Sequence, residues 1–559
     1  MDLARGWLPA VAAVALILLR LRIGMRLHVT PLIAPHDDLL FLSKAQLITQ
    51  GRWLGDTFTQ FTLVKGPFYP LFLATTQFVG IRLIVAEQLL YMASCGLFAS
   101  ALAPRLSGRW TRLLIFAVLA FNPMSFATDP ATRVIREGIY PALTLAVIAF
   151  AVGWTVRLGA ATVVRAAWSV GLGASLAVFW LTREEGLWLI PSLCLVGATT
   201  LVQRRRVGAV WVRRVVQGCL IAGVIVAISL VAVISANCRR YGVCATTEFG
   251  TSWFSHAVRS LYRVKPHNPA PYALLPREAR ERVYAVSPRF RELRLELEGN
   301  LGRHWIRYGP CAALGICDDL AGTWITWAVR DAVAVHGYYA RGAEAVSAYY
   351  QELANEIDAA CSHGGLDCSA PGYSILPPWR DQYNGPLLAA IPRAALFLAS
   401  FDGFTPGSDP CSSTRICTPL MIALYSRIGE SAYAVEDDTD RWIMAALGML
   451  YARVTPVLGG AALGMYAVAI HRTRRKRGDL FLVLVGGVLL CAIVVRLLLL
   501  AVIDVTSAPA INVLYTSPLH PLMLAFVVLM FMQRAWRPPP EPGVDGAVID
   551  QRNRSTMRS

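Results

Sequence analysis

Charged side chains are scarce in this sequence. Asp, Glu, Lys and Arg together make up 16% of the 559 residues, whereas hydrophobic residues make up 55%. Soluble domains carry about 25% charged residues, so this composition excludes an ordinary soluble protein and indicates a membrane protein. The sequence also lacks a stripe of clustered basic and aromatic residues, so its formal net charge of +17 does not indicate binding to nucleic acid.

Long apolar runs recur along the chain, and roughly 17–25 apolar residues are needed for a helix to cross a ~30 Å hydrocarbon core. No small-x-small cleavage site follows the first run before Arg20 and Arg22, so we expect a retained span and not a signal peptide. We predict an all-α polytopic membrane protein with about ten transmembrane helices. The expected spans lie near residues 7–27, 83–104, 111–128, 138–156, 167–182, 185–203, 215–236, 455–471, 480–502 and 518–534.

Arginine is distributed unevenly between the short loops, and cytoplasmic loops carry the excess of basic residues. With a cytoplasmic N-terminus, this rule holds at four loops and fails at the outer end of the first span, where Arg20, Arg22 and Arg26 lie. The four basic loops contain Arg105 to Arg112, Arg157 to Arg165, Arg204 to Arg214 and Arg472 to Arg477. We therefore expect the long segment 237–440 to face the extracytoplasmic side.

The cysteines differ sharply by location. Eight of the twelve form four close pairs in the expected outer segment, and the other four lie in expected spans. An even number of cysteines in an exported segment indicates an oxidising compartment. The pairs are Cys238/Cys244, Cys311/Cys317, Cys361/Cys368 and Cys411/Cys417. We expect local disulfides; the alternatives are disulfides between pairs or a zinc site, which prefers tighter Cys-x-x-Cys spacing with histidine nearby.

Four regions follow from these patterns. Residues 1–236 form an N-terminal transmembrane module whose outer loop, 28–80, carries interfacial helices, and residues 237–440 form a cysteine-rich, mainly α extracytoplasmic domain. Residues 441–535 form a C-terminal transmembrane module with about three spans, and residues 536–559 a disordered cytoplasmic tail. The outer segment contains no Asn-x-Ser/Thr sequon, which favours a bacterial inner membrane over a secretory lumen.

Charged residues gather at five places on the expected outer side of the bilayer, where unpaired charges are costly. The first is Asp37-Asp38, two adjacent carboxylates that raise one another's pKa unless a cation, a proton or a substrate lies between them. The other places contain Lys65-Gly66-Pro67; Asp129, Arg133, Arg136, Glu137 and Tyr140; Thr182-Arg183-Glu184-Glu185-Gly186; and Asp504 with Leu514 to Pro521. Such a cluster suits a reaction on a phosphate-bearing lipid, because cations hold the phosphate while a carboxylate accepts a proton.

Residues 1–236 and 441–535 resemble the GT-C glycosyltransferases, polytopic enzymes that take a sugar from a polyprenyl-phosphate carrier outside the cytoplasm. Lys65-Gly66-Pro67 is similar to the Lys-Pro-Pro segment of lipid A aminoarabinose transferases and their relatives, with Gly66 in place of the first proline. The segment 182–186 is similar to the family's TRPEG turn, and Tyr515 to Pro521 to its RYLLPxxP entry to the last span. Leu514 stands where the family has an arginine, a role that Arg496 or His520 could take.

The resemblance implies a membrane glycosyltransferase with a lipid-linked donor. It implies that Asp37 or Asp38 is the general base, and that Lys65, Arg183 and Arg133 or Arg136 bind the donor phosphate. Further pocket candidates are Glu137, Glu184, Tyr515 and His520. The expected partners are a polyprenyl-phosphate-linked sugar, an acceptor that the sequence does not identify, and the lipid bilayer. No cofactor is firmly indicated, although a divalent cation could bind between Asp37 and Asp129 or Glu137.

The same residues also have structural interpretations. An acidic pair can stabilise a helix N-terminus, Lys65 can extend to the membrane interface, and Arg133, Arg136 and Glu137 can form ion pairs along one helix. Two other functions stay open, a transporter or flippase of a lipid-linked sugar and an envelope scaffold or receptor. A transporter would be expected to carry internal repeats and interrupted helices, and neither is evident in the sequence.

Overall fold

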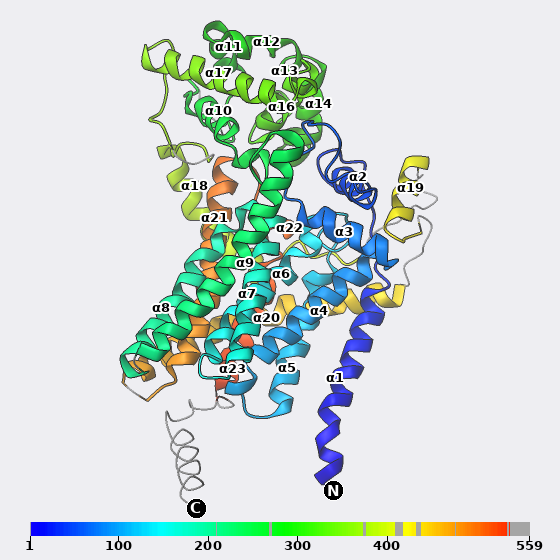
Figure 1. Ribbon diagram of the computed structural model, residues 1–559, viewed down its shortest axis with the longest axis vertical. Coiled ribbons are helices and arrows are strands. Elements are labelled where there is room, and N and C mark those ends of the chain that lie inside the picture. The colour runs from blue at the N-terminus through cyan, green and yellow to red at the C-terminus, as the bar shows by residue number, and fades with distance from the viewer. Residues whose placement is uncertain are drawn as a thin grey trace, which may run out of the picture.

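The computed structural model describes residues 2–207, 209–267, 271–372, 376–407, 418–431, 438–475, 477–533 and 536. Within these ranges the chain is helical and forms no β-strand, which confirms the all-α prediction there. Figure 1 shows two parts, a bundle of long helices with the N-terminus at its far end and a group of shorter helices stacked on the opposite end.

The bundle contains a helix at each of the ten expected spans. These helices are α1 (Asp2–Gly24), α4 (Leu83–Ala101), α5 (Arg109–Ala120), α6 (Tyr140–Val156), α7 (Thr162–Thr182), α8 (Ile190–Val207), α9 (Ala209–Tyr241), α20 (Asp438–Arg474), α21 (Leu480–Thr506) and α23 (Leu519–Phe531). Six of them, α1, α4, α7, α9, α20 and α21, are long and apolar enough to cross a membrane. The chain is therefore a multi-pass membrane protein, but the expected count of ten spans is not confirmed.

The span expected at 111–128 shows why the count differs. Helix α5 has 12 residues, about 18 Å at 1.5 Å per residue, well short of the hydrocarbon core. It ends before Asn122-Pro123, where the Asn122 side chain accepts a hydrogen bond from the backbone N–H of Met124 at 3.2 Å and starts a 3-10 turn. Proline cannot continue a helix because it lacks the N–H group. An apolar run thus covers a short helix followed by a turn.

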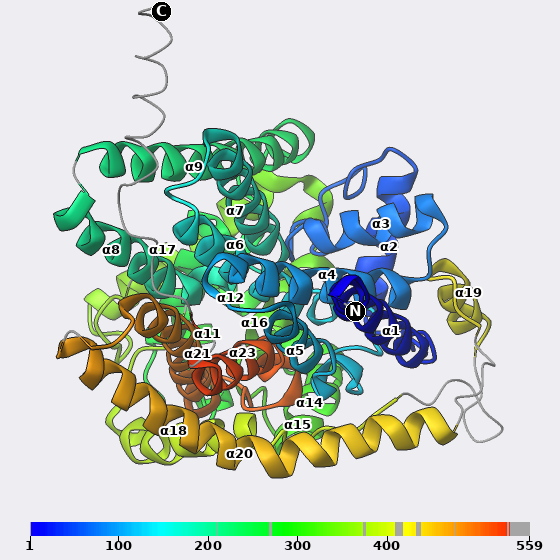
Figure 2. The same cartoon turned by 90° about the horizontal axis from the view of Figure 1, so that it is seen from below.

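Helix α6 lies inside the bundle, packed against α4 and α7. Its buried residues run almost continuously from Tyr140 to Thr155, as expected of a helix that is apolar on all sides. Helices α7 and α9 approach closely at Gly173, where a Cβ atom would lie 2.7 Å from the carbonyl oxygen of Ala222. Small residues allow such close approach in membrane bundles. Seen from below, α8 and α9 lie on one side of the bundle and α20 runs along the opposite side (Figure 2).

The stacked group of helices, Ser252–Ser362, is called the cap below. It contains α10 (Ser252–Arg263), α11 (Arg277–Val286), α12 (Pro288–Glu292), α13 (Arg294–Leu297), α14 (Asn300–Ile306), α15 (Ala312–Leu314), α16 (Trp324–Val335) and α17 (Ala343–Ser362). Helix α10 packs against α17 around a hydrophobic core of its own. The cysteines form the local disulfides Cys238–Cys244, Cys311–Cys317 and Cys361–Cys368, which confirms local pairing for these six. Cys411 and Cys417 lie outside the described residues.

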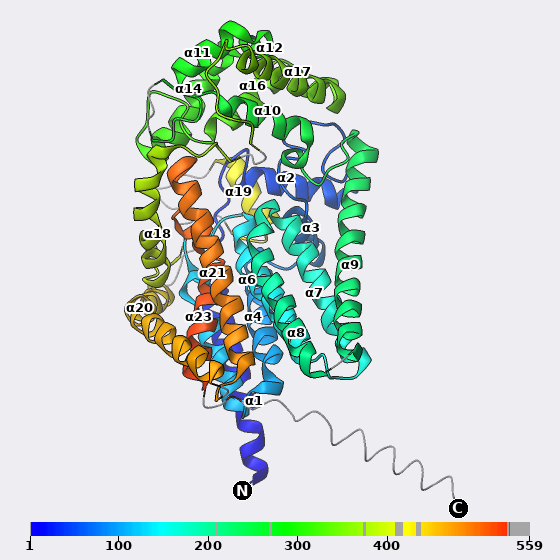
Figure 3. The same ribbon diagram turned by 90° about the vertical axis from the view of Figure 1, so that its left-hand side faces the viewer.

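The loop between α1 and α4 connects the bundle to the cap. It contains α2 (Asp38–Thr49) and α3 (Phe68–Val79), and α2 lies between the cap and the bundle (Figure 3). Leu54, Phe58 and Leu63 of this loop are buried in the hydrophobic core of the cap. Helices α18 (Asn384–Ala399), α19 (Pro419–Arg427) and α22 (Val513–Thr516) complete the chain. The expected disordered tail, apart from Trp536, lies outside the described residues.

Candidate functional site

Charged residues from four of the five expected places meet at the end of the bundle nearest the cap. The segment before α2, the turn before α3, the segment before α6 and the turn after α7 all lie at this end (Figure 1). Ion pairs join them, namely Lys65–Asp37, Arg133–Asp38, Arg136–Glu184, Arg183–Glu137 and Arg183–Glu185. Tyr515 of α22 joins from the fifth place, since the guanidinium carbon of Arg183 lies 5.3 Å from the centre of its ring.

The two adjacent aspartates have different environments. The Asp38 side chain is 0% exposed and accepts hydrogen bonds from Arg133 Nη2 at 2.6 Å, from the N–H of Val134 at 3.0 Å and from the N–H of Leu32 at 3.3 Å. The Asp37 side chain is 46% exposed and accepts a hydrogen bond from Lys65 Nζ. Asp38 therefore fastens the start of α2 to neighbouring segments, whereas Asp37 is open to a reactant.

The pKa values of Asp37 and Asp38 are shifted in opposite directions. Burial raises the pKa of Asp38, and the opposing effects of Arg133 and the Val134 N–H group do not cancel that increase. Burial alone would also raise the pKa of Asp37, but Lys65, Arg133 and Arg136 together hold it below its usual value. Asp37 is thus an ionised, accessible carboxylate at neutral pH. The pKa of Lys65 is lowered by burial, an effect that Asp37 only partly offsets.

Gly66 allows the Lys65 turn to approach the turn after α7. A Cβ atom at Gly66 would lie 2.1 Å from the carbonyl oxygen of Leu181 and 3.2 Å from Glu184 Oε1. No side chain fits at 2.1 Å from a backbone atom, so the close approach requires glycine. This contact explains why Gly66 stands where the resembling segment has proline, and it places Lys65 beside residues 182–185.

Arg183 lies at the centre of the charged cluster. Its side chain is 2% exposed, and its guanidinium group donates to Glu137 Oε1 at 2.5 Å and to Glu185 Oε2 at 2.8 Å. Burial opposes the charged form, but Glu185 and Glu137 outweigh burial and raise the pKa of Arg183. Burial likewise opposes ionisation of Glu185, yet Arg183, Arg496 and Arg136 lower its pKa to about 2. Both partners are therefore charged at neutral pH.

Arg496 is a cation whose charge is only partly compensated. It lies on α21, and its side chain is 1% exposed, with Nη1 at 3.8 Å from Glu185 Oε2. None of its three side-chain nitrogens has a hydrogen-bond partner among the described residues. A buried guanidinium group without hydrogen bonds is costly unless a further anion completes its environment. Of the two substitutes for the missing arginine at position 514, Arg496 is therefore the one that joins the cluster.

The remaining predicted residues lie elsewhere or have local roles. His520 is buried at the start of α23 and contacts the ring of Phe401, with 4.7 Å between ring centres. Asp129 adopts a positive φ of 68°, and its N–H donates to Thr132 Oγ1 at 3.1 Å, as in a turn. Asp504 accepts from Arg393 and from the backbone N–H groups of the turn after α21. None of these contacts reaches Asp37.

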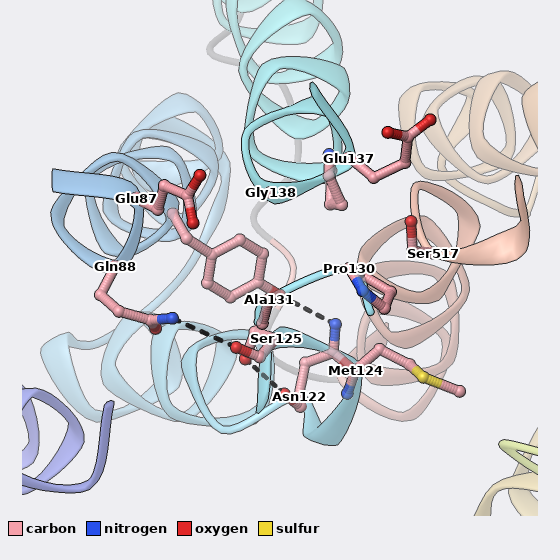
Figure 4. Close-up of a pocket in the computed structure, with 12 residues that line it drawn as sticks. Glu87, Gln88, Asn122, Met124, Ser125, Pro130, Ala131, Glu137, Gly138 and Ser517 are labelled. Carbon is pink, nitrogen blue, oxygen red and sulfur yellow. Dashed lines mark hydrogen bonds between the residues drawn. The ribbon is translucent and has the colours of Figure 1, made fainter. Parts of the chain in front are cut away.

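A small cavity adjoins the cluster. It is bounded by Glu87, Gln88, Asn122, Glu137 and other residues shown in Figure 4. Its volume of about 20 Å³ is enough for a water molecule but not for a sugar. Glu87 Oε2 and Gln88 Oε1 have no hydrogen-bond partner among the described residues, as expected where a water molecule completes the network. Glu137 lines this cavity and also accepts a hydrogen bond from Arg183, so the cavity adjoins the charged cluster.

No group of three or more His, Cys, Asp or Glu side chains placed to hold a metal ion occurs among the described residues. Glu137, one expected partner of Asp37 in a cation site, is hydrogen-bonded to Arg183. A divalent cation that binds between Asp37 and Asp129 or Glu137 stays a prediction.

Sequence reasoning assigned no role to two residues that complete the cluster. Glu185 lies between Arg183 and Arg496 and holds both arginines at one place. Trp188 lies 5.6 Å from the guanidinium carbon of Arg496, measured to its ring centre, and its indole N–H donates to the Tyr140 hydroxyl at 3.1 Å. The available signal was Arg496 itself, the one charged residue in the apolar run 480–502, because an ionisable residue within a span indicates function.

No protein-family model and no curated protein matches this chain. Among solved structures, it is similar to ArnT from Cupriavidus metallidurans in the apo state, with 16% identity over 95% of this chain and 78% of that chain and a TM-score of 0.31. It is also similar to ArnT from the same organism bound to undecaprenyl phosphate, with 14% identity, the same coverage and a TM-score of 0.31.

Proposed function

We propose that this protein is a membrane glycosyltransferase that moves a sugar from a polyprenyl-phosphate carrier to an acceptor hydroxyl on the extracytoplasmic side. The observation that carries this proposal is the meeting of one accessible carboxylate, Asp37, with several buried cations at the end of a membrane bundle. A base beside an anion site at one end of a membrane bundle is what sugar transfer from a lipid phosphate requires.

The support for an anionic donor comes from the nitrogens of Arg496 that are unpartnered among the described residues and not from the net charge of the cluster, which is balanced. Its five carboxylates are matched by five cations, and these are Asp37, Asp38, Glu137, Glu184 and Glu185 against Lys65, Arg133, Arg136, Arg183 and Arg496. Arg496 has donor groups free for an anion and shares Glu185 with Arg183, and Gly66, next to Lys65, lies against the turn that carries Arg183. We propose that these three cations bind the donor phosphate, with Arg496 at the place expected for an arginine next to Tyr515.

The proposed reaction is a single displacement at the anomeric carbon. Asp37 accepts the proton of the acceptor hydroxyl, whose oxygen then forms a bond to the anomeric carbon. The bond from that carbon to the phosphate oxygen breaks, and its electron pair leaves with the polyprenyl phosphate. The phosphate gains one negative charge while Asp37 loses one, so the net charge of the site is unchanged. Preorganised cations stabilise the developing phosphate charge, and inversion at the anomeric carbon follows from one displacement.

Transfer by the purified protein in lipid nanodiscs tests this proposal. Labelled polyprenyl-phosphate sugar is supplied with lipid, glycan and peptide acceptors, and covalently labelled product is measured. We expect the Asp37→Asn variant to lose about 10²–10⁴-fold in rate, the usual contribution of a general base. The matched control is Asp56→Asn, because Asp56 lies in the same loop with a similar exposed fraction, 42% against 46%, and pairs only with Arg52 and Arg240 among the described residues. The same protein in sealed liposomes distinguishes the alternative, because movement of the intact donor across the bilayer without transfer would instead indicate a transporter.

A further inference from the structure

Asp37 and Lys65 lie near the two ends of the segment 36–65 of the first loop, and one helix of the cap holds this segment near both ends. Asp37 follows His36 directly, and Lys65 lies two residues after Leu63. Helix α16 contributes Asp331 to the first end and Arg330 to the second. These two residues are neighbours in the sequence, so one rigid element reaches both ends.

The first attachment is made by His36. Its Nε2 atom lies 3.3 Å from Asp331 Oδ2, and the same oxygen accepts a hydrogen bond from Trp305 Nε1 at 3.0 Å. The imidazole ring also packs against Phe61, Trp305 and Trp327, with ring centres 5.0, 5.1 and 5.1 Å away. Only 15% of the His36 side chain is exposed. The backbone immediately before Asp37 is thus fixed to the cap.

The second attachment is made by Arg330. Its Nη2 atom donates to the carbonyl oxygen of Gln60 at 2.7 Å and to the carboxylate of Glu248, and both members of this ion pair are 0% exposed. The backbone N–H of Glu248 in turn donates to the carbonyl oxygen of Leu63 at 2.8 Å. Buried hydrogen bonds of this kind break only at considerable cost. The backbone just before Lys65 is therefore fixed to the same helix.

We propose that α16 is a positioning element for sugar transfer, in which Asp331 and Arg330 set the separation between Asp37 and Lys65. This inference rests on the function proposed above. The base and one phosphate-binding cation then have their working geometry only while the cap is docked on the loop, so the cap is part of the transfer site without touching the substrate. Asp331 and Arg330 act only by holding the first loop in position, since neither residue lies at the reacting atoms.

The partly exposed His36–Asp331 pair allows the test without disruption of the buried Arg330–Glu248 pair. His36→Phe keeps a ring among the aromatic neighbours and removes the contact of Nε2 with Asp331, whereas His36→Gln retains a donor. Displacement of a catalytic group by about 1 Å can cost about 10²-fold in rate. We expect His36→Phe and Asp331→Asn each to lower kcat by about 10- to 100-fold. The KM for the donor should stay within about twofold of its original value, because Arg183 and Arg496 are unchanged. The double variant should lose no more kcat than either single variant. His36→Gln should recover most of kcat.

The matched control is His336→Phe, because His336 follows the same helix and its Nε2 lies 2.9 Å from Glu296 Oε2, away from the first loop. An equal loss of kcat in this control, or unchanged kcat in the two test variants, would overturn the inference while transfer by the unaltered protein upholds the proposed function. Hydrogen exchange of the amides at 36–41 supplies a readout that does not depend on transfer. Faster exchange there in His36→Phe, but not in His336→Phe, is expected, and unchanged exchange would overturn the inference even if the protein transfers no sugar.

Discussion

Asp37→Asn and Asp38→Asn are expected to have different effects although the two residues are adjacent: the first should lower the rate of transfer and the second the stability of the fold. Loss of a general base costs about 10²–10⁴-fold, which corresponds to about 3–5.5 kcal/mol of activation free energy at 1.36 kcal/mol per tenfold. The Asp37 side chain is 46% exposed, and an Asn side-chain oxygen can still accept a hydrogen bond from Lys65, whose side chain is 11% exposed, so the change should cost less stability than the loss of a fully buried carboxylate. Asp37→Asn should therefore fold normally and transfer slowly.

Asp38→Asn should instead reduce the stability of the fold. The Asp38 carboxylate is fully buried and compensates Arg133, whose side chain is 17% exposed. Removal of one partner of a buried ion pair typically costs about 3–5 kcal/mol. Thermal unfolding in detergent, followed by intrinsic fluorescence, and single-turnover transfer should be measured for both variants. An Asp38→Asn variant that unfolds like the unaltered protein and is inactive, beside an active Asp37→Asn variant, would show that the base has been assigned to the wrong aspartate.

Three further changes test neighbouring parts of the site. Gly66→Ala places a Cβ atom 2.1 Å from the Leu181 carbonyl oxygen, so it should lower the free energy of unfolding by about 1–3 kcal/mol and impair transfer. A variant that unfolds like the unaltered protein would contradict the close contact. Arg496→Met removes a buried guanidinium group without hydrogen bonds, so the ligand-free protein should be as stable as the unaltered protein or more stable. Donor binding, measured by calorimetry, should weaken by roughly 10- to 150-fold, the equivalent of a charged hydrogen bond of about 1.5–3 kcal/mol. Unchanged binding would exclude Arg496 from the phosphate site. Lys65→Met removes the leading cation that lowers the pKa of Asp37. In the unaltered protein the base is lost only as pH falls through this lowered pKa, so the acid side of the pH–rate profile lies below the usual aspartate pKa. In Lys65→Met the acid side should move to higher pH. An acid side that stays in place would show that Lys65 does not set the pKa of the base.

The helical fold was largely predictable because transmembrane helices are long and their apolar runs are local. Helices form at all ten expected runs, and three of the four local cysteine pairs form disulfides. The number of spans was not predictable, because short helices such as α5 and α23 are as apolar as long ones. Local turns such as Asn122-Pro123 end them within the same run.

The gathering of charges at one end was expected, but the partners within it were not. Asp37 and Asp38 are indistinguishable in the sequence, and they differ because Arg133 and Val134, almost a hundred residues away, bind Asp38 whereas Lys65 binds Asp37. The expected phosphate ligands Lys65 and Arg183 are paired with carboxylates, whereas all three side-chain nitrogens of Arg496, far along the chain, lack a hydrogen-bond partner among the described residues. Such pairings depend on packing between distant helices and leave no periodic pattern in the sequence.

Transfer of labelled sugar from a polyprenyl-phosphate donor by the purified protein tests the central claim most directly. The expected result is a covalent, anomerically inverted product that forms with the unaltered protein and with Asp56→Asn but falls by about 10²–10⁴-fold with Asp37→Asn. Transfer at an unchanged rate by a correctly folded Asp37→Asn protein would contradict the claim, and so would movement of the intact donor across the bilayer without any transfer.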